Sequence, residues 1–451
     1  MFAFPAGSSK ESQNEAPSSS TVCTGSRSNR GPDTHEMARV SLLAEIVDEP
    51  GALYRVLGYF WRHDIQITHM ESRPSNTNTV ANIYLSFYGK RGTPSTDKLL
   101  AELKRQPECK NMLILDEKVV PWFPKHLSDL DKIANRVIDA GIDGGDLQSD
   151  HPGFTDSVYR NRRKELATLA RNYVYHEPIP RIAYRPEEVA TWGKVYRRLQ
   201  AIREYACNEY KKVIPLMEAQ CGYGPDSIPQ VEDISRFLSD RTGFRLRPVA
   251  GLLSSRDFLN GLAFRVFFST QYIRHSSKPL YTPEPDICHE LLGHAPMFAD
   301  PDFADFSHEI GLASLGATDH DITRLATCYW HSVEFGLLKE DGKLRAYGAG
   351  VLSSFGEMEH SMGMVSSSSE PGTQPPSKML PWNPAVAAET DYPITTYQPK
   401  YFVAESLADA KAKMRQFTDE LPRPFRARYN PLNGSIWVDR PCRSDQTAAK
   451  K

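Results

Sequence analysis

Two histidines five residues apart, His289 and His294, have the spacing in this sequence that most directly suggests chemistry. Glu290 stands beside the first, within the segment His-Glu-Leu-Leu-Gly-His. Two imidazoles with a third oxygen ligand are how proteins hold zinc or ferrous iron while leaving coordination positions open for reaction. The pattern predicts a metal site. It leaves open both a non-haem iron oxygenase and a zinc hydrolase that uses Glu290 as general base. A third possibility is a ligand-binding regulatory protein that functions through its N-terminal domain.

The spacing of these histidines restricts the secondary structure of the segment that carries them. On an unbroken α-helix, residues five apart diverge by about 140°. We therefore expect a short helix that starts near Asp286 and ends at Gly293, so that both rings reach one ion. A third ligand is expected from Glu334, because a carboxylate within an apolar helical stretch needs a cation or a polar partner. Trp330, one turn earlier on the same face, would form a wall beside the metal.

The composition sets the class of protein. Of 451 residues, 40% are hydrophobic and 24% are charged, as in a soluble globular protein of two or three domains. The near-equal count of 54 basic and 56 acidic residues argues against binding to nucleic acid or an anionic membrane. No apolar run is long enough for a membrane span. Seven cysteines without a CxxC pair favour free thiols and a cytoplasmic location.

The N-terminal third divides into a tail and a small domain. Residues 1–38 are rich in Ser, Gly, Asn and Thr, which predicts a disordered tail. Residues 39–118 alternate strand and helix patterns in the order βαββαβ, the ferredoxin-like arrangement. This domain carries no catalytic cluster, so it could be a spacer, a dimer contact or a small-molecule sensor. Its expected strands are Val40–Val47, Ile65–Ser72, Val80–Tyr88 and Asn111–Leu115, with helices around residues 53–60 and over Ser95–Gln106.

A linker over residues 119–154 leads into a segment with helical periodicity, residues 155–425. Apolar stripes that begin at Trp192, Phe303 and Leu407 predict helices whose buried faces form a core. Met358–Asn383 is expected to be a surface loop, and its Ser/Pro-rich part at residues 364–377 has no assigned role. In residues 426–451, Asn433-Gly434 predicts a β-hairpin between Ala427–Tyr429 and Ser435–Val438, followed by a polar tail.

Longer colinear runs make a family resemblance specific. These runs are Thr68–Ser75, Asp150–Phe154, Gly243–Phe258, Tyr281–His294, Tyr347–Gly350 and Leu352–Glu357. On them, the chain resembles the biopterin-dependent aromatic amino acid hydroxylases from about Val40 to Asp439. The resemblance implies an α+β fold, in which an N-terminal ferredoxin-like ACT regulatory domain precedes a mainly α-helical catalytic domain with a C-terminal β-hairpin. It also removes the hydrolase alternative.

The resemblance implies a monooxygenase that uses Fe(II), tetrahydrobiopterin and O₂. The iron ligands would be His289, His294 and Glu334, and the catalytic residues Glu290, Tyr329 and Glu334. The pterin would contact Leu253, Ser255, Phe258, Glu290, Ala326 and Tyr329. The amino acid substrate would bind through its carboxylate to Arg274, in a pocket completed by Tyr281, Thr282, Pro283, Trp330, Gly350, Ser353 and Glu357.

The resemblance also bears on substrate and assembly. Trp330 and the aliphatic Ile394 favour hydroxylation of L-phenylalanine to L-tyrosine. Phe268 replaces a histidine of the mammalian-type enzymes, and residues 394–396 look like those of tryptophan-hydroxylating members, so tryptophan (or tyrosine) stays an alternative substrate. No heptad pattern follows the hairpin, and we expect a homodimer. In the family, regulatory phenylalanine binds at the segments that here hold Gly51, Leu53 and His69.

Overall fold

The computed structural model describes residues 39–73, 79–89, 92–137, 151–280, 282, 284–364, 377–394 and 396–445. The described residues form two compact units. The N-terminal unit comprises residues 39–119 and 438–443, and the C-terminal unit comprises residues 120–437 and 444–445. The expectations for residues 1–38, Tyr281, Pro283, Thr395 and most of the 364–377 insertion lie outside the described residues. The α+β class, with a mostly helical C-terminal unit, is confirmed.

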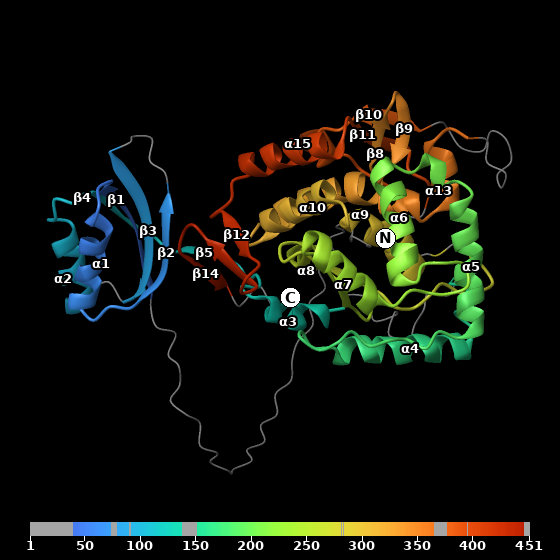
Figure 1. The fold of residues 1–451 in the computed structure, drawn as a ribbon, viewed down its shortest axis with the longest axis horizontal. Helices are drawn as coiled ribbons and strands as arrows, with labels where there is room; N and C mark the ends of the chain where they lie inside the picture. The colour runs from blue at the N-terminus through green and yellow to red at the C-terminus, as the bar shows by residue number, and fades with distance from the viewer. Residues whose placement is uncertain are drawn as a thin grey trace, which may run out of the picture. The chain divides into compact units, whose positions relative to one another are not determined.

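The N-terminal unit is built on a four-stranded antiparallel sheet in the order β2-β3-β1-β4. Two helices lie on the same side of this sheet (Figure 1). Along the strands alternate side chains point to this side, which is the period expected of a half-covered sheet. The strands are β1 (Arg39–Val47), β2 (Ile67–Arg73), β3 (Val80–Tyr88) and β4 (Cys109–Leu115), and the helices are α1 (Ala52–Arg62) and α2 (Pro94–Leu103).

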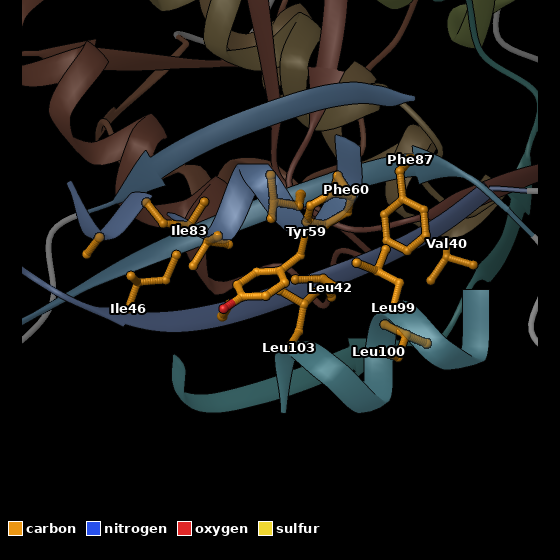
Figure 2. Close-up of a cluster of buried hydrophobic side chains, with 14 residues drawn as sticks. Val40, Leu42, Ile46, Tyr59, Phe60, Ile83, Phe87, Leu99, Leu100 and Leu103 are labelled. Atoms are coloured by element: carbon orange, nitrogen blue, oxygen red, sulfur yellow. The ribbon is translucent and has the colours of Figure 1, made fainter. Parts of the chain in front are cut away.

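Apolar side chains from the sheet and both helices fill the space between them (Figure 2). Phe60 of α1 meets Phe87 of β3 edge to face, with ring centroids 5.2 Å apart. Leu42 lies opposite Leu85 in the β1–β3 register, and both are fully buried. Val56 and Phe60 of α1, in the helix predicted around residues 53–60, therefore face the sheet, and their burial anchors α1.

Helices make up most of the C-terminal unit, and the stripes that begin at Trp192, Phe303 and Leu407 are buried as predicted. Helix α10 packs along α15, and the two lie side by side in Figure 1. No helix among the described residues is long and apolar enough to cross a membrane. The helices are η1 (Leu127–Asp129), α3 (Leu130–Ala134), α4 (Ser157–Asn172), α5 (Pro186–Gln200), η3 (Arg203–Tyr205), α6 (Asn208–Cys221), α7 (Val231–Thr242), α8 (Ser255–Leu262), η4 (His289–His294), α9 (Ala295–Phe298), α10 (Pro301–Ser314), α11 (Asp319–Tyr329), η5 (Trp330–Glu334), α12 (Ala349–Leu352), α13 (Phe355–Ser361), α14 (Pro384–Ala387) and α15 (Leu407–Glu420).

Apart from the C-terminal hairpin, the short strands in this unit were not predicted from the sequence. A mixed sheet runs in the order β10-β11-β8-β9, and β6 pairs in parallel with β7. The prediction of one loop over Met358–Asn383 was wrong at both ends, because α13 extends to Ser361 and β10 pairs with β11. The predicted hairpin is confirmed. The strands outside the four-stranded sheet are β5 (Lys118–Pro121), β6 (Arg245–Pro248), β7 (Val266–Ser269), β8 (Leu337–Glu340), β9 (Lys343–Ala346), β10 (Lys378–Pro381), β11 (Lys400–Ala404), β12 (Ala427–Asn430), β13 (Ser435–Val438) and β14 (Cys442–Asp445), the last paired with β5.

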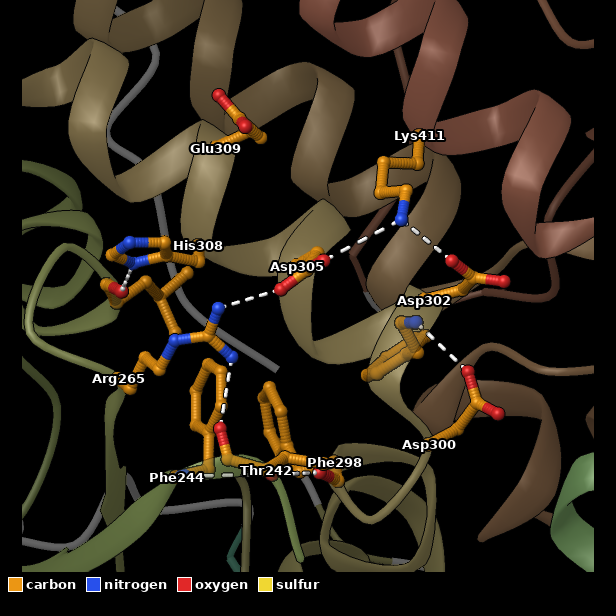
Figure 3. A network of polar contacts seen from close by, with 12 residues as sticks. Thr242, Phe244, Arg265, Phe298, Asp300, Asp302, Asp305, His308, Glu309 and Lys411 are labelled. Carbon is orange, nitrogen blue, oxygen red and sulfur yellow. Dashed lines mark hydrogen bonds and ion pairs between the residues drawn. The ribbon is translucent and has the colours of Figure 1, made fainter.

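A polar network joins α7, α9, α10 and α15 (Figure 3). The Thr242 hydroxyl donates to the carbonyl of Phe298 at 2.7 Å. Arg265 donates to the Thr242 carbonyl at 2.9 Å and to Asp305 at 2.5 Å. Lys411 of α15 contacts the carboxylates of Asp302 and Asp305. The network fixes the end of α9, and Phe298 at that end packs near His294, with ring centroids 6.3 Å apart.

Candidate active site

The two histidines and Glu334 lie on two separate π-helical turns. His289 and His294 are the first and last residues of η4, which the Ala295 N–H closes by donating to the carbonyl of Glu290. Glu334 ends η5, where the Phe335 N–H donates to the carbonyl of Trp330 at 3.0 Å. In a π-turn the hydrogen bond joins residues five apart, so side chains with that spacing come together. The predicted helix end at Gly293 was therefore wrong, because the helix widens there and continues into α9.

Gly293 has a different role from the predicted one. A Cβ atom at this position would lie 2.7 Å from the carbonyl oxygen of Ala349, which is closer than real Cβ contacts. The glycine lets α12 approach η4 without a gap. This approach brings Ser353, which follows α12, next to His289.

The donor atoms of the three side chains are close enough to share one ion. The Nε2 atoms of His289 and His294 are 3.1 Å apart. Glu334 lies 3.4 Å from His289 and 3.1 Å from His294. An ion about 2.1 Å from three adjacent octahedral donors holds them about 3.0 Å apart. The set is therefore shaped for one face of a metal coordination sphere, and all three residues are buried.

The protonation state of His289 is the one that a metal-binding histidine needs. The Ser353 hydroxyl donates its single hydrogen to the Ala349 carbonyl at 2.7 Å, so it must accept from His289 Nδ1, 2.8 Å away. That bond leaves the lone pair of Nε2 facing the other two ligands. Burial lowers the pKa of His289 to about 4, which keeps the ring neutral near pH 7. Burial alone would raise the pKa of Glu334, but His294, the nearer imidazole at 3.1 Å, outweighs it and holds that pKa well below its usual range.

Asp286 ties η4 to the predicted substrate arginine. Its carboxylate accepts from Nε and Nη2 of Arg274 at 2.8 and 2.7 Å, and from the backbone N–H of Arg274 and His289. Although burial opposes ionisation, Arg274 keeps the pKa of Asp286 low. Such two-point pairing fixes the guanidinium plane. Nη1 of Arg274 has one long hydrogen bond, 3.4 Å to the Pro279 carbonyl.

Glu290 and Tyr329 place polar atoms in the same buried region. One oxygen of Glu290 accepts from the backbone N–H and hydroxyl of Thr270, both at 3.4 Å. Its other oxygen and the hydroxyl of Tyr329 are buried without a hydrogen-bond partner in the described part of the chain. Burial raises the pKa of Glu290 to about 8. Phe258 meets Tyr329 edge to face, with ring centroids 5.2 Å apart. Buried polar atoms of this kind are usually partnered, so they suit a bound polar ligand.

The remaining predicted residues lie at several positions around this centre. Trp330 starts η5 and stacks on Tyr392, with ring centroids 4.3 Å apart. Gly350 lies where a Cβ would be 2.7 Å from the Phe335 ring, and Glu357 is buried beside Tyr401. The structure places Ser353 behind His289, as described above, and Thr282 donates to the carbonyl of Glu284. The three other predicted pterin neighbours are buried or half-buried on or near α8 and α11, and they are Leu253, Ser255 and Ala326.

A family model described as biopterin-dependent aromatic amino acid hydroxylase matches residues 121–449. The chain belongs to this family. A phenylalanine-4-hydroxylase of Dictyostelium discoideum is 52% identical over 396 residues, which are 87% of each chain. The phenylalanine-4-hydroxylase of Rattus norvegicus is 49% identical over 410 residues, which are 90% of this chain and 87% of the rat protein. A solved phenylalanine hydroxylase of Chromobacterium violaceum with iron(III) and 7,8-dihydrobiopterin is 28% identical, covers 52% of this chain and 82% of its own, and has a TM-score of 0.46.

As a biopterin-dependent hydroxylase, the chain must hold a flat, nitrogen-rich ring beside its metal, and the residues present fit that ring. Glu290 and Tyr329 offer buried polar atoms without partners, and Phe258 offers an aromatic surface next to them. Three residues that were not predicted for the site, Asp286, Thr270 and Gln398, contact the predicted residues Arg274, Glu290 and Trp330. The sequence predicted Asp286 only as the start of the helix, and Thr270 and Gln398 carry no local signal.

Proposed function

We propose that this hydroxylase converts L-phenylalanine to L-tyrosine with tetrahydrobiopterin and O₂, at Fe(II) held by His289, His294 and Glu334. The observation that carries the proposal is the buried set of three donor atoms 3.1–3.4 Å apart. Two neutral imidazoles with one carboxylate on one face are the ligand set of non-haem iron oxygenases. The similarity to phenylalanine-4-hydroxylases over about nine-tenths of the chain supports the choice of substrate.

Iron and pterin, when bound, supply the chemistry that activates O₂. The residues of the chain bind and orient the iron, the pterin and the substrate, and they exclude water from the site. Ser353 holds His289 in the tautomer that a ligand needs. Burial of the site excludes water, which would otherwise compete with the substrate ring. The pterin is proposed to lie against Phe258, with Leu253 and Ser255 along its edge and with Glu290, Ala326 and Tyr329 on its other side.

Arg274 is proposed to bind the substrate carboxylate. Its Nε and Nη2 are committed to Asp286, which leaves Nη1 for a second carboxylate. Because Asp286 also accepts from the backbone N–H of His289, one carboxylate sets the positions of both the arginine and a metal ligand. The proposed pocket is completed by Trp330, Gly350, Glu357 and Thr282, and by Tyr281 and Pro283, which lie outside the described residues.

The choice of phenylalanine over tryptophan can be tested directly. Iron-loaded protein with tetrahydrobiopterin is expected to convert phenylalanine with a higher kcat/KM than tryptophan, because Trp330 and Ile394 narrow the pocket. Product formation is measured by chromatography at matched oxygen concentration. Equal kcat/KM values, or a higher value for tryptophan, would show that the alternative substrate is correct.

For the N-terminal unit, we propose that residues 39–118 form an ACT-type regulatory domain. Its element order, β1-α1-β2-β3-α2-β4, and the sheet order 2-3-1-4 support this assignment. Gly51 adopts a φ of +84° at the start of α1. Regulatory phenylalanine is proposed to bind at the segments that hold Gly51, Leu53 and His69. Calorimetry is expected to find more than one phenylalanine bound per chain, whereas a single bound phenylalanine would argue against a regulatory site.

A further inference from the structure

Gln398 is a fully buried amide with all of its polar groups in use. Its backbone N–H donates to Glu357 at 3.0 Å, and its carbonyl accepts from His360 at 3.2 Å. Its side-chain oxygen accepts from the indole N–H of Trp330 at 3.0 Å, and its side-chain nitrogen donates to the carbonyl of Pro393 at 2.9 Å. Only 1% of its surface is exposed. This residue therefore links four others around the proposed substrate pocket.

The hydrogen bond between Gln398 and Trp330 fixes the orientation of the indole ring. An indole has one polar group, the N–H, and it is a donor only. With that N–H held by Gln398, the ring plane is fixed further by Tyr392, whose ring lies at 17° to it with centroids 4.3 Å apart. Without the amide oxygen, the N–H would be left unpaired in a buried site, which favours a rotated ring.

The second side-chain bond reaches the backbone beside Ile394. Pro393 immediately precedes Ile394, which is half-buried and which resembles the aliphatic residue of phenylalanine-hydroxylating enzymes. An amide is required here because one bond needs an acceptor and the other needs a donor. Neither a carboxylate nor an apolar side chain of the same length supplies both.

We propose that Gln398 is a positioning residue whose side-chain amide fixes Trp330 and the Pro393–Ile394 segment relative to each other, and thereby sets the size of the aromatic ring that the pocket accepts. The inference rests on the proposed function, in which Trp330 and Ile394 face the amino acid substrate. Gln398 is not among the residues proposed to hold iron or pterin. Its loss should therefore change the use of the amino acids and leave the iron content and the KM for tetrahydrobiopterin unchanged.

The first test replaces Gln398 with methionine, which keeps the length of the side chain and removes both bonds. We expect the ratio of kcat/KM for phenylalanine to that for tryptophan to fall by about 3- to 10-fold, the effect of one or two lost hydrogen bonds. Most of the change should lie in the KM for phenylalanine. Gln200→Met, at an exposed position, is the matched control and should leave the ratio unchanged.

A second variant, Gln398→Glu, gives a readout that a general loss of stability would not produce. When protonated, a carboxylic acid supplies one donor and one acceptor as the amide does, and when ionised it supplies acceptors only. The substrate ratio of this variant should approach the wild-type value at low pH and fall as pH rises. Glu357, His360 and Tyr401 also face this position, so each ratio is compared with that of the wild-type protein at the same pH.

Trp330→Phe separates failure of this inference from failure of the proposed pocket. If Trp330→Phe leaves the substrate ratio unchanged, Trp330 does not face the substrate and the proposed pocket is wrong. If it changes the ratio but neither Gln398 variant does, the positioning role of Gln398 is wrong. The expected result is that Trp330→Phe and Gln398→Met both change the ratio, and that the double variant changes it by less than the product of the two.

Discussion

The proton position on His289 depends on one hydroxyl, that of Ser353. Sequence comparison assigned Ser353 to the substrate pocket, because it lies within a run that resembles that part of the family. The structure shows its hydroxyl between the Ala349 carbonyl and His289 Nδ1. A sequence identifies a residue and its approximate neighbourhood, but the direction of a single hydrogen bond depends on the packing of two elements that are far apart in the chain.

The buried carboxyl group of Glu357 should make the stability of the protein depend on pH. Burial raises its pKa to about 7, from an ordinary value near 4.5, while Tyr401 and Gln398 donate to it. Between these values the folded protein binds a proton that the unfolded chain does not bind. The stabilising contribution is therefore complete below about pH 4.5 and is lost as the pH rises through 7.

Glu357→Gln should remove this dependence. The free energy of unfolding of the wild-type protein, relative to the variant, is expected to fall by on the order of 3 kcal/mol between pH 5 and pH 8. Urea unfolding at several pH values measures it. Glu389→Gln, at an exposed position, is the control. Parallel pH curves for the wild-type and Glu357→Gln proteins would contradict the prediction.

At the scale of elements, the π-helical turns mark the limit of what the sequence could predict. The five-residue spacing of His289 and His294 excluded a regular α-helix, and that inference is correct. It could not distinguish a helix that ends at Gly293 from one that widens, because both bring the rings together. The choice depends on α12 packing against η4, a contact between residues more than fifty positions apart.

Among the other elements, those with a local sequence signal were predicted and those that depend on distant contacts were missed. The apolar stripes that begin at Trp192, Phe303 and Leu407 predicted buried helix faces correctly, because helical periodicity is a local signal. The strands β8, β10 and β11 were missed, because they are four or five residues long and their parallel pairing joins distant segments. The three metal-binding candidates were nevertheless found, since residue type and apolar context indicated them before any fold was known.

Gly293→Ala tests the packing of η4. The added methyl would meet the Ala349 carbonyl at 2.7 Å, so the backbone of η4 or α12 must shift. We expect a loss of about 1–3 kcal/mol in the free energy of unfolding and a lower iron content per chain. Thermal unfolding and metal analysis measure the two effects.

The matched control is Gly224→Ala, where an added Cβ meets nothing within 4 Å. This variant should retain full iron content. If Gly293→Ala bound iron as well as the wild-type protein and unfolded at the same temperature, the close approach of α12 would not be needed to form the site.

At the scale of the whole molecule, the β12–β13 hairpin offers an exposed apolar residue for assembly. Leu432 lies in its turn and is 95% exposed. We propose that the hairpins of two copies pair to form a homodimer that covers Leu432, because most homo-oligomers are two-fold dimers in which both subunits use the same surface. Light scattering should give a mass near two chains, and Leu432→Glu should shift it toward one.

Leu216→Glu, at a less exposed leucine on α6, is the control for the added charge and should leave the mass unchanged. A wild-type mass near one or four chains would contradict the proposal. So would a Leu432→Glu protein that stays dimeric at low micromolar concentration.

Iron held by His289, His294 and Glu334 is proposed to be the site of a pterin-dependent hydroxylation of phenylalanine. The most direct measurement titrates metal-free protein with Fe(II) and records tyrosine formed in the presence of tetrahydrobiopterin, O₂ and phenylalanine. Activity should rise in proportion to bound iron and saturate at one iron per chain, and Glu334→Gln should bind little iron and form little tyrosine. Tyrosine formation that does not depend on iron, or a Glu334→Gln protein with full iron content and full activity, would contradict the account.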